Sequence, residues 1–355
     1  MTCQYIAAAL ANVPGGVLVD TVGRKGLLMA VSLFWVGFPY LLIGFTHSYA
    51  MLLVCIALVG VGNSLWHPTA IPTLGQRYPE RKGLVLSLHG MGGNVGDAIA
   101  PVVIGAALAA FSWREVVVAN VLPGLVVALL MFVFLGTLQL RPRKAGGAQK
   151  TQSMADYLAG LGPLFRNRSL MLLSMGSSFR TMTQSALLTF LPVYLANAMG
   201  YSPAWVGACM FALQAAGFAA APVAGHLSDR MGRKQILIGS MLSSAAVMAA
   251  MALAGGSPLF IALVAVLGFF LYATRPVIQA WLLESTPRNM GGSSIGVLFG
   301  AQALGGALGP LLGGIVADHY GLLATFYFLA GTILVANLIV VWVPPVFTAA
   351  GSVKD

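Results

Sequence analysis

Three charged residues stand inside long apolar runs of this sequence, namely Asp97, Arg180 and Arg275. An unpaired charge at the centre of a bilayer costs about 2.5–3.5 kcal/mol on insertion scales, so such residues need a pairing or functional reason. Gln184 and Gln279 each follow an arginine by four residues and therefore share its helical face. Because the guanidinium fork suits carboxylate and phosphonate groups, these positions predict substrate binding through an anionic group. The alternative is that one or both arginines pair with Asp97 or bind backbone carbonyls and only stabilise the fold.

Two further residues share a helical face and add polar chemistry. Asn63 and His67 are four residues apart inside one apolar run, and we expect both to contact substrate. Imidazole titrates near neutral pH, so His67 is also a candidate proton carrier, although a histidine inside a helix is often an ordinary hydrogen-bonding residue. Asp97 is the one carboxylate inside a run, and because burial favours its protonated form it is the first candidate for proton coupling. A structural ion pair is the alternative for Asp97, and His89 is a further candidate.

The composition is that of an integral membrane protein. Of the 355 residues, 58% are hydrophobic and only 8% are charged, and the mean hydropathy is +0.88, whereas about 25% of the residues in soluble domains are charged. Soluble enzymes, nucleic-acid-binding proteins and disordered proteins are therefore excluded. The three cysteines lie in apolar runs without metal-ligand spacing, and no nucleotide loop or catalytic triad is found. We expect no catalytic site, no metal and no cofactor.

The apolar runs predict an all-α fold, because each is long enough to cross a bilayer as a helix of about 20 residues. Eleven such helices are expected, at 4–19, 26–45, 50–74, 83–110, 115–137, 169–198, 203–226, 235–254, 258–283, 292–317 and 322–345. The only long polar stretch predicts a cytoplasmic linker at 138–168. It separates an N-terminal bundle at 1–137 from a C-terminal bundle at 169–346, which is followed by a tail at 347–355.

Basic residues gather on one side of the expected membrane. Fifteen Lys and Arg residues fall in loops on the side of Arg24 and Lys25, and Arg114 alone falls in the opposite loops. Basic loops face the cytoplasm in membrane proteins. We therefore expect a multi-pass protein of the inner, cytoplasmic membrane of a cell, with a cytoplasmic C-terminus.

Two of the basic loops share one motif, which indicates an internal duplication. The first loop carries Gly16, Asp20, Gly23, Arg24 and Lys25, and 209 residues later the second carries Gly225, Asp229, Arg230, Gly232, Arg233 and Lys234. The same offset relates Gly96, Pro101 and Gly105 to Gly305, Pro310 and Gly314. Glycine allows close helix approach, and an aspartate at a helix end can accept from a neighbouring helix N-terminus or pair with an arginine. These loops are therefore candidate gates, with a simple turn and a membrane anchor as the alternative.

The duplication also predicts a helix before the first one in this sequence. Shifting the run at 169–198 back by 209 residues places its counterpart ahead of Met1. We expect a twelve-helix protein whose first helix is missing here, through a late start or a truncation, with a genuine eleven-helix variant as the alternative.

Two sets of six helices, a central linker and a Gly-x3-Asp-x2-Gly-Arg-Lys loop in each half resemble the major facilitator superfamily over essentially the whole sequence. The resemblance implies a six-plus-six helix bundle whose fourth, seventh and tenth helices, which hold His67, Arg180 and Arg275, line a central cavity. A shorter stretch, Gly62-Asn63-Ser64-Leu65-Trp66-His67-Pro68, is similar to fosmidomycin-resistance-type exporters. Ile56 stands where many drug exporters carry an arginine, so a proton step through that arginine is not implied.

Together these features predict a secondary transporter that works by alternating access. The preferred function is export of a small anionic or drug-like compound in exchange for protons, as in drug-resistance efflux. The alternatives are uptake of an organic anion together with protons, and a non-transporting membrane protein that keeps the fold. The expected partners are a small-molecule substrate, protons and the lipid bilayer, without nucleic acid and with the protein as a monomer.

Overall fold

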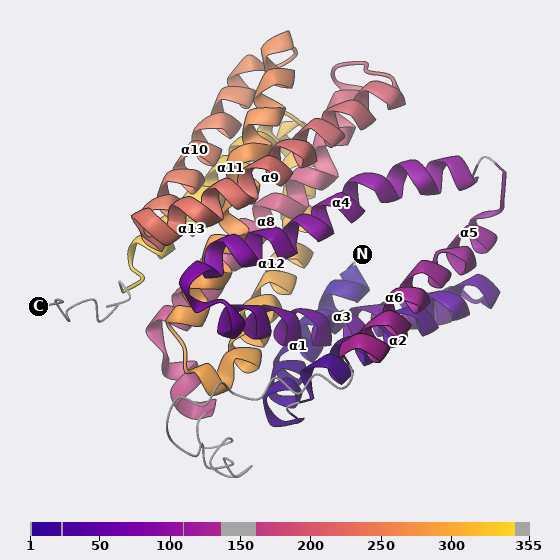
Figure 1. Cartoon of the computed structure of the whole chain (residues 1–355). Coiled ribbons are helices and arrows are strands. Elements are labelled where there is room, and N and C mark those ends of the chain that lie inside the picture. The colour runs from indigo at the N-terminus through magenta and orange to yellow at the C-terminus, as the bar shows by residue number, and fades with distance from the viewer. Residues whose placement is uncertain (1, 23, 109, 136–160, 345–355) are drawn as a thin grey trace, which may run out of the picture.

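A computed structural model describes residues 2–22, 24–108, 110–135 and 161–344, and it contains helices but no strand in those ranges (Figure 1). The first half holds α1 (Thr2–Val22), α2 (Lys25–Phe45), α3 (Tyr49–Arg77), α4 (Lys82–Leu108), α5 (Trp113–Ala119) and α6 (Val121–Leu135). The second half holds α8 (Arg168–Asn197), α9 (Pro203–Met231), α10 (Arg233–Ala254), α11 (Pro258–Glu284), α12 (Gly291–Tyr320) and α13 (Ala324–Val341). Two short 3-10 turns, Pro79–Arg81 and Arg288–Met290, precede α4 and α12.

Short polar residues and glycines set the ends of these helices. The side chains of Asn167 and Ser202 accept hydrogen bonds from backbone N–H groups in the first turns of α8 and α9. Gly232 and Gly321, with φ of +102° and +85°, make the sharp turns that follow α9 and α12. α9 and α12 are thereby each followed by a short connection to the next helix.

The fifth predicted helix is broken in the structure. α5 ends at Ala119 and α6 begins at Val121, whereas the sequence predicts one continuous helix over 115–137. Pro123 is the physical reason, because a proline lacks the N–H that would bond to Ala119 and its ring crowds that carbonyl. Pro123 instead occupies the first turn of α6, where a missing N–H costs nothing.

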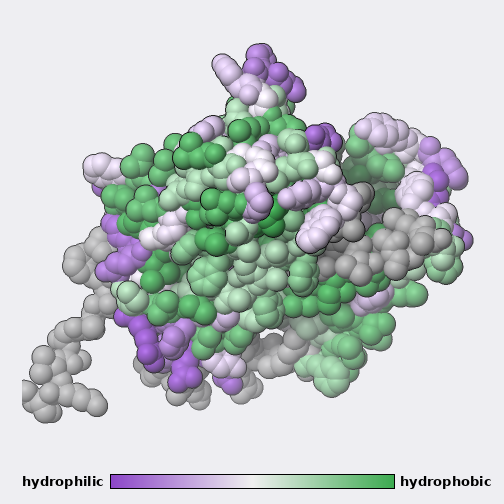
Figure 2. Space-filling view, turned by 90° about the horizontal axis from the view of Figure 1, so that it is seen from above, coloured by the Kyte–Doolittle hydropathy of each residue, from purple (hydrophilic) through white to green (hydrophobic). Residues whose placement is uncertain are grey.

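Nine helices in the described ranges are long and apolar enough to cross a membrane, counting α5 and α6 together. The two long helices outside this set are α4 and α8, of 27 and 30 residues. α8 is less apolar because it carries serines and Arg180 within its length. Both pack beside helices that qualify, so the bundle is a multi-pass membrane fold. Figure 2 agrees, since hydrophobic residues cover most of the face that it shows.

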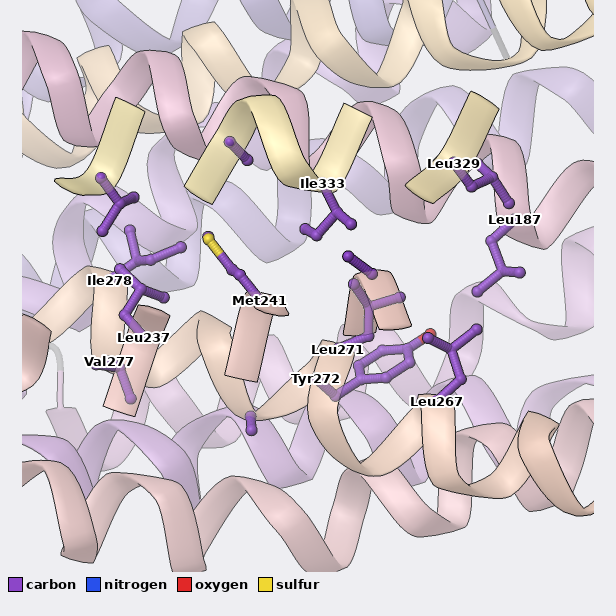
Figure 3. Packing of buried hydrophobic residues seen from close by; sticks show 14 of the residues in the cluster. Leu187, Leu237, Met241, Leu267, Leu271, Tyr272, Val277, Ile278, Leu329 and Ile333 are labelled. Atoms are coloured by element: carbon purple, nitrogen blue, oxygen red, sulfur yellow. The ribbon is translucent and has the colours of Figure 1, made fainter. Parts of the chain in front are cut away.

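The best-packed core belongs to the second half. Leu187, Met241, Leu271 and Ile333 come from α8, α10, α11 and α13 and belong to one buried cluster (Figure 3). Close packing of this kind fixes the positions of these helices relative to one another. The core therefore holds α11, the helix that carries Arg275, in one orientation.

The halves meet along two seams. α1 and α3 pack along α12, and α4 packs along α9 and α11. Small residues allow this approach: a side chain on Gly296 of α12 would collide with the backbone of Asn12 in α1. These two contacts between halves carry the site described next.

Candidate functional site

Asp20 lies near the end of α1 and caps the start of α12 in the other half. Its two carboxylate oxygens accept hydrogen bonds from the backbone N–H groups of Gly292, at 2.8 Å, and Ser293, at 2.7 Å. The first N–H groups of a helix have no partner within the helix and carry partial positive charge, so a carboxylate there is stabilising. Gly16, one turn earlier, is buried against Gly292, where any side chain would strike the backbone.

Asp229 makes the same contact in the opposite direction. It lies near the end of α9, and its oxygens accept from the N–H groups of Gly83, at 3.1 Å, and Leu84, at 3.2 Å, at the start of α4. Gly225 packs on the backbone of Gly83, as Gly16 does on Gly292. All these equivalent positions are 209 residues apart. Each half therefore supplies one capping aspartate and receives one, as an approximate two-fold arrangement requires.

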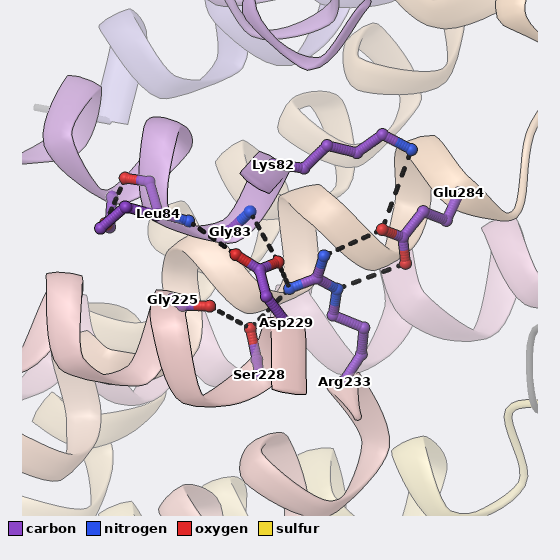
Figure 4. Close-up of polar contacts among 9 residues, drawn as sticks. Lys82, Gly83, Leu84, Gly225, Ser228, Asp229, Arg233 and Glu284 are labelled. Atoms are coloured by element: carbon purple, nitrogen blue, oxygen red, sulfur yellow. Dashed lines mark hydrogen bonds and ion pairs between the residues drawn. The ribbon is translucent and has the colours of Figure 1, made fainter. Parts of the chain in front are cut away.

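The second cap carries a charge network (Figure 4). Arg233 contacts Asp229 at 2.5 Å and Glu284 at 2.9 Å, and Lys82 reaches Glu284 at 3.8 Å. The side chains involved are only 11–20% exposed, so water screens them weakly. Lys82 belongs to the first half and the other three to the second, so the network ties the halves together. Gly75 occupies the position equivalent to Glu284, and the first cap has no such carboxylate.

The remaining loop residues have different surroundings. Arg24 and Arg230 are exposed, and Lys25 donates a hydrogen bond to a glutamine of α3 at 3.3 Å. Gly232 forms the left-handed turn between α9 and α10, and Gly23 lies outside the described residues. The motif thus divides into capping and packing residues, which face the other half, and basic residues, of which Arg233 alone joins a described ion pair between charged side chains.

A cavity of about 300 Å³ lies between the halves, two turns along α4 from the second cap. It is lined from the first half by residues of α3 and α4 and from the second half by residues of α9 and α11. Its polar and aromatic lining consists of Trp66, His67, Ser87, His89, Tyr272, Arg275 and Gln279. No carboxylate among the described side chains lines it. A cavity of this size fits a small ligand.

Arg275 gives the cavity its positive charge. It is half-buried, and within the described part of the chain its guanidinium has neither a hydrogen bond nor an ion pair. Gln279, one turn further along α11, lines the same cavity. A guanidinium without a counter-charge, beside an amide, is a site that can bind a carboxylate or a phosphonate through paired hydrogen bonds.

The two histidines of the cavity stand among aromatic rings. His67 stacks on Phe299 of α12 at 4.5 Å between ring centroids and meets His89 edge-on at 6.3 Å. His89 in turn stacks on Trp66 at 6.3 Å. The Nδ1 atom of His67 is buried and has no hydrogen-bond partner among the described residues. Buried polar atoms in proteins are nearly always paired, so this nitrogen is a point where a ligand or a proton can be accommodated.

Arg180 has a different environment from Arg275. It is 1% exposed, and it donates hydrogen bonds to the Thr274 hydroxyl at 2.8 Å and to the Leu271 carbonyl at 3.5 Å. It joins α8 to α11 and is not among the residues that line the cavity.

The other predicted site residues also lie away from the cavity lining. Gln184 is half-buried and Asn63 is exposed, and neither lines the cavity. The side chain of Asp97 lies outside the described residues. The structure therefore brings together Arg275, Gln279 and His67 of the predicted substrate residues.

Glu284, Lys82 and Trp66 are site residues that the motifs do not predict. Glu284 could have been noticed in the sequence, because it is an acidic residue at the end of its helix that faces the basic loops, where Lys and Arg residues are concentrated. Lys82 and Trp66 carry no comparable signal, since a basic loop residue and an aromatic residue are common in any membrane protein.

A family model described as the major facilitator superfamily matches residues 1–223 and 205–352. The chain belongs to the major facilitator superfamily. Solved structures agree on the fold: the human organic anion transporter MFSD10 (TETRAN) gives a TM-score of 0.79 at 17% identity over 96% of this chain and 82% of that one. The E. coli fucose:proton symporter FucP gives 0.73 at 17% identity over 96% and 89%.

Two relatives are more similar in sequence. The hexuronate transporter of Bacillus subtilis (strain 168) is 25% identical over 95% of this chain and 82% of its own length. The multidrug resistance protein MdtG of Serratia proteamaculans (strain 568) is 42% identical, but over only 32% of this chain and 28% of its own length. This superfamily protein therefore resembles both a hexuronate transporter and a multidrug resistance protein.

Proposed function

We propose that the protein is a proton-coupled secondary transporter of a small organic anion. The observation that carries this proposal is Arg275, which faces a cavity between the halves with Gln279 beside it and without a counter-charge among the described side chains. An anion bound there satisfies a charge that is otherwise costly to keep in a membrane. The hexuronate transporter and the organic anion transporter among the similar proteins support the same class of substrate.

Alternating access follows from the two caps. Both close the end of the molecule that carries the basic loops, and breaking them would open that end. Because basic loops face the cytoplasm, we assign this end to the cytoplasmic side of an inner membrane, with the C-terminus on the same side. The capping residues then act as gates, and the cavity is reached from the outside while they hold. A monomer is sufficient for this mechanism.

The direction of transport has two candidate forms. Export in exchange for protons is supported by the partial similarity to MdtG, and the efflux and drug-resistance functions belong to this form. Uptake together with protons is supported by the longer similarity to the hexuronate transporter and by the fold of the fucose:proton symporter. A non-transporting role is the third candidate, and any substrate-dependent flux would exclude it.

The test is substrate binding by the purified full chain and a variant without the cavity charge. We expect glucuronate, benzoate or phenylphosphonate to bind, and Arg275→Gln to lower the affinity about 10- to 100-fold, since a hydrogen bond to a charged group contributes about 1.5–3 kcal/mol. Arg230→Gln, which removes an exposed arginine of the same charge, is the matched control and leaves the affinity unchanged. Equal affinities in the native protein and Arg275→Gln, with both folded, would refute the anion site.

A further inference from the structure

We propose that His67 and His89 take up a proton when an anion binds at Arg275, so that proton and anion cross the membrane in the same direction. This inference rests on the anion transport proposed above and deepens it by fixing the sign of the coupling between the two ions. It follows from the placement of charges and rings around one cavity.

The proton-accepting groups and the anion-binding group come from different halves. His67 lies on α3 and His89 on α4, in the first half, and Arg275 lies on α11, in the second half. All three line the same cavity of about 300 Å³. Arg275 and both imidazoles therefore share one space between the halves. The site is therefore complete only while the two halves are together.

The empty cavity resists protonation of either histidine. An imidazolium there would stand beside the positive charge of Arg275, and the two rings already meet at 6.3 Å. The other titratable group in the lining is Tyr272, and Arg180 lies against α11 through Thr274 and Leu271. Tyrosine is neutral near pH 7 and arginine is positive, so none of these groups compensates a second positive charge.

A bound anion reverses this balance. Its negative charge offsets Arg275 and attracts a proton to the nearest imidazole, and the faces of Phe299 and Trp66, already stacked on the histidines, stabilise an imidazolium by cation–π attraction. The buried Nδ1 of His67, which lacks a partner in the described structure, then becomes an N–H that can donate to the anion. By thermodynamic reciprocity the proton also raises the affinity for the anion.

Cooperative binding decides between the two directions of coupling. Exchange requires that proton and substrate displace one another, whereas these charges make each ion favour the other. The bound anion cancels the charge of Arg275 and so removes a repulsion that opposes protonation of the histidines. Since the proton gradient across a bacterial-type inner membrane points inward, co-transport gives net uptake of the anion.

The experiment measures protons taken up on binding by the full chain, by calorimetry in buffers of different ionisation heat, with glucuronate and with benzoate as probes. We expect uptake of up to one proton per anion near pH 7, and an affinity that rises up to tenfold for each unit by which the pH falls. His67→Gln and His89→Gln each reduce the uptake, and the double variant removes it and lowers the anion affinity without abolishing binding. His47→Gln, in the exposed loop between α2 and α3, is the control and keeps the native uptake.

Transport by the protein in proteoliposomes shows independently in which direction the proton moves relative to the anion. Anion added outside raises the external pH if the proton enters with it, and lowers it if the proton leaves in exchange. This inference would be overturned by acidification of the external medium or by proton release on binding. It would also be overturned if both histidine variants kept the proton uptake and Asp97→Asn abolished it. Each of these results would leave the proposed anion transport standing. Failure of both probes to bind the native protein would overturn the inference together with the proposed function.

Discussion

Arg180 and Arg275 show how the surroundings of a residue, rather than its type, define its role. Both sit inside long helices of the second half, each with a glutamine four residues later. Arg180 uses its donors on Thr274 and Leu271 of α11, whereas Arg275 uses none of its donors on a described side chain. The sequence predicts the residue type and the depth of both, but which neighbour faces each guanidinium depends on how α8 and α11 pack.

Thr274→Val tests whether Arg180 positions α11 rather than contacting substrate. The variant keeps the shape of the side chain but removes the acceptor at 2.8 Å, so a buried charge loses a hydrogen bond. We expect the free energy of unfolding to fall by about 1–3 kcal/mol, with a lower midpoint in a thermal-shift assay. Thr189→Val, on the exposed part of α8, is the control and leaves the midpoint nearly unchanged. A loss of anion affinity without loss of stability would instead place Arg180 in the substrate site.

At the scale of elements, the two caps predict unequal gates. Asp20 and Asp229 hold α12 and α4 in the same way, and at the second cap Arg233 also joins Asp229 to Glu284, whose equivalent position in the first half is Gly75. Asp229→Asn should therefore weaken the closed end more than Asp20→Asn, by roughly 1–3 kcal/mol against about 1 kcal/mol. Spin labels on the exposed Arg24 and Arg230 positions report the opening as a longer distance between the halves. Equal opening in both variants would show that the charge network adds nothing to the second gate.

Glycine contacts between the halves provide a steric test of the same gates. A methyl group on Gly83 would strike the backbone of Gly225, so Gly83→Ala should hold α4 and α9 apart and lower the rate of anion transport. Gly239→Ala, where a methyl group meets no atom within 4 Å, is the matched control and should transport normally. Native transport by Gly83→Ala would mean that the two backbones need not touch for function.

The length and order of the helices were predictable because charged and turn residues interrupt the apolar runs. The predicted helix at 26–45 matches α2 (Lys25–Phe45), and that at 235–254 matches α10 (Arg233–Ala254). The break before Val121 was missed because an apolar run hides the effect of Pro123 on the backbone. Glu284 was missed as a gate residue because its partners, Lys82 and Arg233, are far away in the sequence and meet only when the halves pack.

At the scale of the whole molecule, the distribution of basic residues predicts which end faces the cytoplasm, and with it the state that the structure represents. Both caps close the end that carries the basic loops, so a cytoplasmic position for that end makes this a form closed to the cytoplasm. The prediction is tested in intact cells with a membrane-impermeant thiol reagent, after Cys3, Cys55 and Cys209 have been replaced by serine. We expect a cysteine at His47 to be labelled from outside and one at Arg230 to be labelled only after the membrane is opened. Both positions are exposed, so access to the reagent depends on the side of the membrane alone. Labelling in the reverse order would turn the caps into extracellular gates, and the same closed contacts would then belong to a form closed to the outside.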